Sequence, residues 1–247
     1  MSERFDGRVA VITGAASGIG QSVAELFAAR GARVVGIDRS DDVTAAVAAL
    51  PGDGHHGIVA DLTATGAADA AVAEAVQVAG RIDILVNSAG IARLAPALEL
   101  TDADWDATIA VNLTAGYRMA RAAGRVMTAA GFGRIVNLAS QAALVALDQH
   151  VAYTASKAGV VGMTKVLARE WAASGVTVNA VSPTVVETPL GRVAWAGEKG
   201  DAMRAQIPVG RFAQPEEIAA LVAYLAGEDA AMITGENIVI DGGYTIV

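Results

Sequence analysis

The chain has 247 residues, 53% of them hydrophobic and 18% charged, so it has ample apolar surface for a buried core and not the composition of a disordered protein. Its net charge of −8 and a pI near 4.9 argue against a basic face for nucleic acid or an anionic membrane surface. With no cysteine, neither disulfides nor thiolate metal sites are available.

The first residues, MSERFDGRVAV, carry charges where a signal peptide needs an apolar run. No uninterrupted apolar stretch reaches membrane-spanning length. We therefore expect a soluble, cytoplasmic protein with no nucleic-acid or membrane partner.

Short β-branched runs alternate along the chain with alanine-rich segments long enough to form helices. The expected strands are Arg8 to Thr13, Arg33 to Ile37, Gly57 to Ala60, Ile82 to Asn87, Gly133 to Ala139, Val176 to Ser182 and Asn237 to Ile240. The expected helices include Gly18 to Arg30, Gly66 to Ala79, Asp104 to Ala130 and Ala152 to Ala173. Uniformly apolar strands separated by helices indicate a parallel sheet covered on both faces. This pattern predicts an α/β fold, with residues 1–247 forming one Rossmann-type, doubly wound domain around a seven-stranded sheet.

One segment breaks this alternation late in the chain. Thr188 to Pro215 contains glycines, charged residues and Trp195, and its helical pattern is weak. We interpret residues 188–215 as an insertion that covers the substrate, a candidate lid.

A glycine-rich turn, TGAASGIG, follows the first strand and opens the first helix. Gly14, Gly18 and Gly20 would let backbone N–H groups approach a pyrophosphate at the helix N-terminus. The alternative is an ordinary strand-to-helix turn. The acidic Asp38, eighteen residues after Gly20 at the end of the second strand, favours dinucleotide binding because it can accept hydrogen bonds from the adenosine ribose.

Asp38 also bears on the choice of cofactor. A carboxylate beside the ribose would repel a 2′-phosphate, whereas the neighbouring Arg39 could hold one. We give the carboxylate more weight and predict NAD as the cofactor, with some use of NADP through Arg39 left open.

Tyr153 and Lys157 are four residues apart on a predicted helix, so their side chains lie on one face. The alternative to catalysis is a solvated helix face. A free tyrosine has a pKa of about 10. The Lys157 ammonium and an oxidised nicotinamide would both favour the phenolate, and a shift of two to three units corresponds to roughly 3–4 kcal/mol. Tyr153 could then act as a general base toward an alcohol.

Together these motifs resemble the short-chain dehydrogenase/reductase family along nearly the whole chain. TGAASGIG is similar to the family's TGxxxGxG loop, NSAG at Asn87 to Gly90 to its NNAG, and YTASK to its YxxxK. Ser140 stands where the family's substrate-binding serine is expected, and Asn112 matches its helix asparagine.

The sequence departs from the family pattern at two positions. Ser88 replaces the second asparagine of NNAG, which should perturb only a turn. Thr184 follows Pro183 where the family has glycine, and we expect it to restrict the backbone beside the nicotinamide.

The resemblance implies a role for each catalytic residue. Tyr153 is the general base, Ser140 hydrogen-bonds the reacting oxygen, Lys157 also holds the nicotinamide ribose, and Asn112 positions a water that relays the proton. The cofactor-binding residues expected from the motifs are Gly14, Ser17, Gly18, Ile19, Gly20, Asp38, Asp61, Leu62, Asn87, Ala89, Gly90, Tyr153, Lys157, Pro183, Val186 and Thr188. For Asp61 and Thr188, capping of a helix is the competing role.

The residues around the catalytic motif suggest what the pocket binds. Gln141, Gln149 and His150 are polar positions suited to a substrate with several hydroxyl groups, and Trp195 could close over it or lie at a subunit interface. Trp105 and Trp171 fall on helical patterns and are expected in packing or subunit contacts. His55 and His56 lie in a glycine-rich loop without a carboxylate cluster, so solvated histidines, and no metal site, are expected.

The tail and the 188–215 segment are similar to those of family members that oxidise threitol- or arabitol-type substrates. We therefore expect an NAD-dependent dehydrogenase that interconverts a secondary alcohol of a short polyol or diol and its ketone. The alternatives are a 3-oxoacyl-thioester reductase, another secondary-alcohol or steroid dehydrogenase, and a non-catalytic NAD-binding regulator. The resemblance also implies a homotetramer built partly through the long helices.

Overall fold

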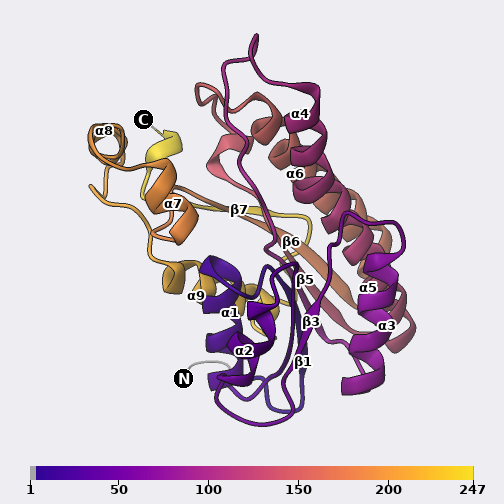
Figure 1. The fold of residues 1–247 in the computed structure, drawn as a ribbon. Coiled ribbons are helices and arrows are strands. Elements are labelled where there is room, and N and C mark those ends of the chain that lie inside the picture. The colour runs from indigo at the N-terminus through magenta and orange to yellow at the C-terminus, as the bar shows by residue number, and fades with distance from the viewer. Residues whose placement is uncertain (1–3, 247) are drawn as a thin grey trace.

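A computed structural model describes residues 4–246, apart from the side chain at position 190. Its seven strands form one parallel sheet in the order β3-β2-β1-β4-β5-β6-β7 (Figure 1). The strands are β1 Val9–Thr13, β2 Arg33–Asp38, β3 His56–Val59, β4 Ile84–Asn87, β5 Gly133–Leu138, β6 Val176–Pro183 and β7 Asn237–Ile240. The expected doubly wound α/β fold is confirmed, and each strand begins and ends within two residues of its predicted range. Residues 1–3 and 247 of the predicted domain lie outside the described residues.

Helices cover both faces of the sheet, as Figure 1 shows. On one face lie α1 Gly18–Ala29, α2 Asp42–Ala48 and α9 Pro215–Ala226, packed on a core that includes Ile12 and Phe27. On the other lie α3 Ala67–Ala79, α5 Gly116–Ala130 and α6 Val151–Trp171, packed on a core that includes Leu85 and Met119. The central strands are buried on both faces, which explains their uniformly apolar sequences.

The helix expected from Asp104 to Ala130 is in fact three segments. It begins as α4, Asp102–Ile109, because the Thr101 hydroxyl accepts a hydrogen bond from the Asp104 N–H at 3.1 Å. A π-helical segment, η1 Ala110–Ala115, then separates α4 from α5. Insertions of this kind are frequent at functional sites, and this one contains Asn112.

The candidate lid contains two short helices, α7 Pro189–Ala194 and α8 Glu198–Gln206, as its weak periodicity predicted. In Figure 1 they lie to one side of the strands' carboxyl ends. A small cluster formed by Met203, Ile207 and Phe212, with Trp195 against it, packs this segment separately from the two main cores. Short 3-10 turns complete the chain at Gln141–Ala143, Ala172–Ser174 and Tyr244–Ile246.

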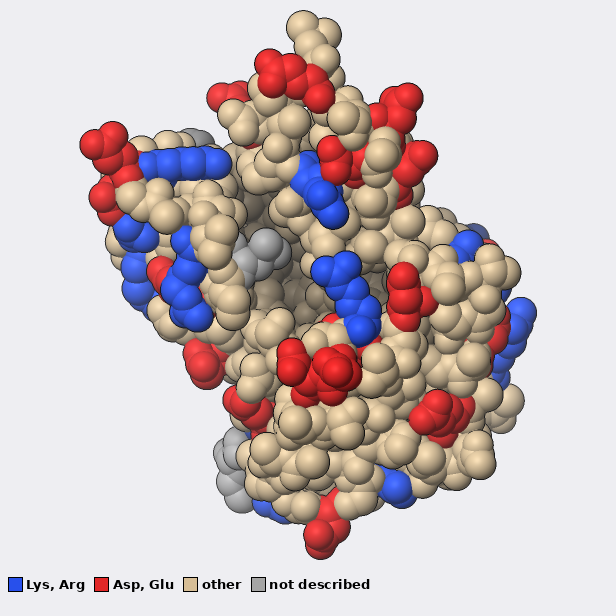
Figure 2. Space-filling view, viewed as in Figure 1, with Lys and Arg blue, Asp and Glu red and all other residues tan. Residues whose placement is uncertain are grey.

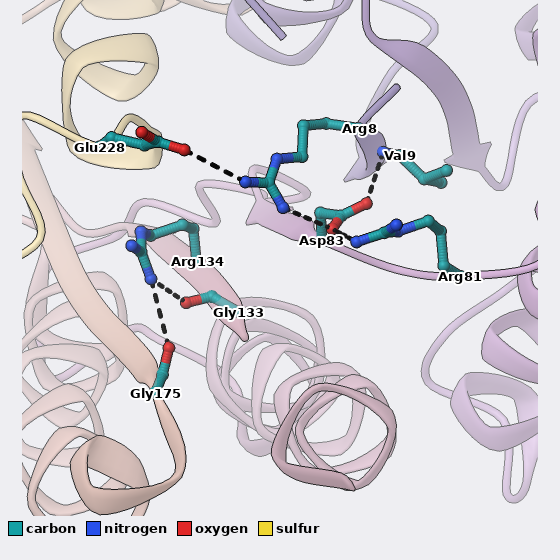
Figure 3. Close-up of polar contacts among 8 residues, drawn as sticks. All are labelled: Arg8, Val9, Arg81, Asp83, Gly133, Arg134, Gly175 and Glu228. Carbon is teal, nitrogen blue, oxygen red and sulfur yellow. Dashed lines mark hydrogen bonds and ion pairs between the residues drawn. The ribbon is translucent and has the colours of Figure 1, made fainter. Parts of the chain in front are cut away.

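Polar contacts hold together the end of the sheet at which the strands begin, opposite the end that carries the glycine-rich turn (Figure 3). Asp83 is 1% exposed, accepts a hydrogen bond from the Val9 N–H at 2.9 Å and pairs with both Arg8 and Arg81. Arg134 donates to the carbonyls of Gly133 and Gly175 at 2.9 and 3.3 Å. The Asp83 contacts join the starts of β1 and β4, and the Arg134 contacts join the starts of β5 and β6, so side chains as well as the backbone hold this end of the sheet.

Among residues 4–246, no helix is both long and apolar enough to cross a membrane.

Candidate active site

Two adjoining cavities lie where the strands end. The larger is about 530 Å³ and the smaller about 190 Å³. Figure 2 shows a hollow in this face, with acidic and basic side chains at its rim. Five residues line both cavities, which makes them two parts of one cleft: Ile19, Ser88, Gly90, Ile91 and Thr188.

The glycine-rich turn lies beside the larger cavity. Gly14 and Gly18 have φ angles of +71° and +60°, a conformation that favours glycine. A Cβ atom on Gly20 would collide with the Gly14 carbonyl, so Gly20 lets α1 pack closely on β1. Ser17 does not cap α1 with its side chain, and this positive helix end meets the cavity. The turn therefore fits the pyrophosphate of a dinucleotide.

Asp38 ends β2 and lines the larger cavity beside Arg39. One carboxylate oxygen accepts a hydrogen bond from the Ala16 N–H at 3.2 Å, and the other accepts one from the Ser40 N–H at 3.1 Å. These bonds hold the carboxylate next to the glycine-rich turn, at the position expected for a ribose contact.

Asp61 and Leu62 line the same cavity after β3. The Asp61 carboxylate accepts hydrogen bonds from the N–H and hydroxyl of Thr63, at 2.9 and 2.7 Å. Those bonds, with a smaller contribution from Arg39, lower the pKa of Asp61. Asp61 does not cap α3, because the residue that precedes that helix is Gly66.

The Asn87 side chain turns into the fold, and its role in binding the cofactor stays a prediction. Its amide donates to the Asn137 side chain at 2.9 Å and to the Gly116 carbonyl at 3.2 Å, inside the fold, and it lines neither of the two cavities of the cleft. The turn after it is held by Thr13, whose hydroxyl accepts hydrogen bonds from the N–H groups of Ser88 and Ala89, each at 3.1 Å. Because those bonds use only the backbone of Ser88, they do not require the asparagine of the family motif.

The remaining predicted cofactor residues divide between the cavities. Pro183 and Val186 line the smaller one, and Thr188 lines both. The Thr188 hydroxyl accepts a hydrogen bond from the Gly191 N–H at 3.0 Å, so its capping role at α7 is confirmed. Gly20 lines neither cavity, since it lies against Gly14.

Ser140, Tyr153 and Lys157 come together in the smaller cavity. Ser140 follows β5, and its hydroxyl accepts a hydrogen bond from the Ala142 N–H at 3.2 Å. Tyr153 lies in the first turn of α6, with Lys157 one turn later. The Lys157 ammonium donates to the Leu138 carbonyl at 2.7 Å and lies 5.7 Å from the centre of the Tyr153 ring. The spacing of four residues therefore places both side chains in one site.

The electrostatics of this group differ from the expected acidification. Burial raises the pKa of Tyr153, and a hydrogen bond with Ser140 opposes that rise. Burial also lowers the pKa of Lys157 to about 8, so Lys157 is not a permanent cation. The physical reason is the same in both cases, because burial disfavours the charged form of each group. The residues of the chain alone do not make Tyr153 a stronger acid.

Asn112 lies deeper than the other catalytic candidates. Its side chain accepts from the Ile91 N–H at 2.8 Å and donates to the Ile91 carbonyl at 2.9 Å and to the Ser156 hydroxyl at 3.1 Å. The side chain thus joins η1 to the loop after β4 and to α6. Its role in positioning a water stays a prediction.

Three of the four predicted substrate residues, Gln141, His150 and Trp195, line the smaller cavity. The His150 ring stacks on Trp195 with centroids 6.3 Å apart and meets Tyr153 edge-on at 5.9 Å. Gln149 is exposed, has a φ angle of +68° and does not line the cavity, so its contact with the substrate stays a prediction.

The prediction missed Thr184 as a lining side chain. Its departure from glycine suggested only a backbone effect, but its side chain lines the smaller cavity. Within the described residues, its buried hydroxyl has no hydrogen-bond partner, and neither does the Gln141 side-chain oxygen. Buried polar atoms without partners are costly, and in a ligand cavity they indicate groups available to the ligand.

The other predicted residues lie away from the cavities. His55 and His56 are both partly exposed, and each also makes a contact: His55 accepts a hydrogen bond from the Val34 N–H at 3.0 Å, and His56 pairs with Glu74 at 2.9 Å. Trp171 packs against the core as expected, whereas Trp105 is 38% exposed. In the part of the chain that the structure describes, no three metal-ligating side chains converge.

A family model described as "Enoyl-(Acyl carrier protein) reductase" matches residues 14–245. The match covers nearly the whole chain, from the second residue of the glycine-rich turn onward. The chain belongs to the short-chain dehydrogenase/reductase family. This confirms the resemblance and the oxidoreductase class that it implied.

Three relatives show what the chain is similar to. It is 56% identical to D-threitol dehydrogenase of Mycolicibacterium smegmatis over 246 residues, covering 98% of this chain and 95% of the relative. It is 51% identical to an NAD-dependent glycerol dehydrogenase of Listeria innocua, covering 97% and 94%. A solved structure from Beutenbergia cavernae, provisionally assigned as an NAD(P)-dependent gluconate 5-dehydrogenase and holding NADP at low occupancy, is 36% identical with a TM-score of 0.94, covering 100% of both chains.

Proposed function

We propose that the chain is an NAD-dependent dehydrogenase that interconverts a secondary alcohol of a short polyol or diol and its ketone. The observation that carries the proposal is the meeting of Ser140, Tyr153 and Lys157 in a cavity that continues into the glycine-lined cleft. The relatives named as threitol and glycerol dehydrogenases, at 56% and 51% identity, favour polyols over other alcohols.

In this reaction Tyr153 takes the proton of the substrate hydroxyl, and Ser140 hydrogen-bonds the reacting oxygen to orient it. Lys157, held by the Leu138 carbonyl, supplies a positive charge near the phenol ring. When bound, the oxidised nicotinamide supplies the hydride acceptor and a second positive charge. Because burial alone raises the pKa of Tyr153, proton removal depends on these two charges.

The preference for NAD is supported by Asp38, whose carboxylate is fixed beside the glycine-rich turn. A 2′-phosphate would meet this carboxylate at close range. The Listeria relative is NAD-dependent, whereas the Beutenbergia structure holds NADP, so the two comparisons differ on this point. Arg39 lines the same cavity and would pair with a 2′-phosphate, so it would permit NADP to bind, although with lower affinity than NAD.

The test is a panel of sugar alcohols and diols with NAD and with NADP, followed by the absorbance of the reduced cofactor. We expect turnover with threitol or a related short polyol, faster with NAD. Tyr153→Phe should abolish turnover while cofactor binding, measured by fluorescence quenching, persists. Turnover of Tyr153→Phe at the wild-type rate would contradict the assigned base.

A second candidate follows from the description of the matching family model, which names an acyl-carrier-protein reductase. The same protein should therefore be assayed with 3-oxoacyl and enoyl thioesters and NADPH. Activity there, and none on the polyol panel, would replace our proposal. Binding of NAD without turnover of any alcohol or thioester would instead favour the regulator. A cytoplasmic location and a homotetramer remain part of the proposal.

A further inference from the structure

The smaller cavity has a wall whose chemistry the catalytic residues do not explain. Much of its lining is apolar, with Leu94, Leu147, Val185 and Ala194 among its residues. A pocket for a simple secondary alcohol needs no polar group beyond those that hold the reacting oxygen. His150 nevertheless lines it, and His150 is 7% exposed.

The hydrogen bonding of His150 determines which ring nitrogen carries a proton. Its Nδ1 lies 2.6 Å from the Asp148 carbonyl oxygen. A carbonyl can only accept, so Nδ1 is the donor and carries the hydrogen. In the neutral ring, Nε2 is then left with a free lone pair and acts as an acceptor. Burial lowers the pKa of His150, which favours that neutral ring.

The ring cannot turn freely, because it is held on two sides. Trp195 stacks on it and Tyr153 meets it edge-on. Within residues 4–246, Nε2 has no hydrogen-bond partner, yet it is not among the fully buried polar atoms that lack one. The accessible Nε2 of a residue that lines the cavity is therefore available to a ligand beside the catalytic tyrosine.

We propose that His150 determines specificity by accepting, at Nε2, a hydrogen bond from a second substrate hydroxyl near the reacting carbon. The contact between the His150 and Tyr153 rings places this acceptor beside the group that takes the proton from the first hydroxyl. A monohydric alcohol would leave Nε2 without a hydrogen bond from the substrate, which disfavours it relative to a diol. This inference rests on the proposed polyol activity and deepens it.

The experiment compares substrates that differ by one hydroxyl group, butane-2,3-diol and butan-2-ol, in wild type and variants. His150→Phe keeps an aromatic ring for Trp195 but removes both nitrogens. We expect it to lower kcat/KM for the diol about 10- to 100-fold, and for butan-2-ol by no more than about 3-fold. Threitol should follow the diol. His56→Phe, the same change at a histidine on β3, should leave the ratio of the two substrates unchanged.

Two further variants keep the test decisive if His150→Phe does not fold, which circular dichroism and cofactor binding would reveal. His150→Gln places its amide near the position of Nε2, whereas His150→Asn places its amide near that of Nδ1. The diol preference should persist in His150→Gln and be lost in His150→Asn.

The outcomes separate this inference from the function beneath it. Suppose that wild type oxidises polyols but His150→Phe keeps the diol preference, or loses activity on both substrates equally. Either result would show that His150 does not bind the second hydroxyl. Equal ratios in the Gln and Asn variants would overturn the inference in the same way. If wild type oxidises no polyol with either cofactor, the proposed function itself fails.

Discussion

Lys157 is buried, and its ammonium titrates within the range of ordinary assay buffers. It is 5% exposed, and its folded-state pKa of about 8 lies below the ordinary 10.5. Between these two values the unfolded chain binds the proton more strongly than the folded chain does. The contribution of Lys157 to the free energy of unfolding therefore rises with pH from about 8 to about 10.5.

This leads to a prediction for Lys157→Met. Removing a buried cation with one carbonyl partner should raise the free energy of unfolding at pH 7 by on the order of 1–3 kcal/mol, while turnover is lost. Urea unfolding at pH 7 and pH 9.5 should show a smaller gain for the variant at the higher pH. A variant less stable than wild type at both pH values would contradict the buried charge as a source of instability.

Asp38 carries the second residue-scale prediction. Asp38→Ala removes the carboxylate and leaves Arg39 in the cavity, so the ratio of kcat/KM with NADP to that with NAD should rise about tenfold or more. Asp41→Ala, an acidic residue just beyond that cavity, is the matched control and should leave the ratio as it is. An unchanged ratio in Asp38→Ala would contradict the proposed contact between Asp38 and the ribose.

Residue types and spacing predicted which candidate catalytic side chains meet, since Tyr153 and Lys157 are one helical turn apart. They did not predict the pKa of Tyr153, because burial depends on packing by residues far away in sequence. They also did not predict the inward turn of Asn87, whose partner Asn137 is fifty residues away on β5.

At the scale of elements, η1 interrupts what sequence periodicity presents as one helix. Alanine-rich sequence favours helix without distinguishing α from π hydrogen bonding, so the interruption has no local signal. The interruption coincides with a tertiary contact, because Asn112, inside η1, hydrogen-bonds both backbone groups of Ile91.

Asn112→Ala tests how much this contact contributes to stability and to turnover. It would leave the Ile91 N–H and carbonyl without their side-chain partner, which should cost roughly 2–4 kcal/mol in the free energy of unfolding. Turnover should fall too, because Ile91 lines both cavities. Thermal unfolding and the kcat and KM values with NAD would measure both effects. An unfolding free energy within 0.5 kcal/mol of wild type, roughly the scatter for neutral surface changes, would contradict the bridging role.

Residues 188–215 were predictable as a break in the strand and helix rhythm, but their contacts were not. Trp195 could equally have been an interface residue by sequence. The structure places it on His150, with the Lys199 ammonium 4.6 Å from its ring centre. Whether the segment opens and closes stays a prediction.

At the scale of the whole molecule, the fold was the most predictable feature, because apolar strands buried on both faces leave little choice but a covered parallel sheet. Assembly is less accessible to such reasoning. A groove runs between α5 and α6, lined by Tyr117, Gly124, Arg125 and Val166 among others. Val166 is 54% exposed and Tyr117 42% exposed.

This surface is where we expect the long helices to pair. Light scattering should give a mass of about four times 24.9 kDa for wild type. Val166→Glu would place a charge in the apolar part of the groove and should shift the mass to smaller species. Val59→Glu, at an equally exposed valine on β3, should leave the mass unchanged. A monomeric wild-type protein would contradict the proposed tetramer.

The cluster around Asp83 fastens the sheet at the end away from the cleft (Figure 3). Its ion pairs and backbone bonds use no residue that lines either cavity. The contacts that stabilise the sheet and the residues that line the cleft are thus separate sets. Substitutions in the loops that line the cleft need not weaken the contacts around Asp83. A chain organised in this way is free to acquire new substrates during evolution, or at the bench, while keeping its architecture.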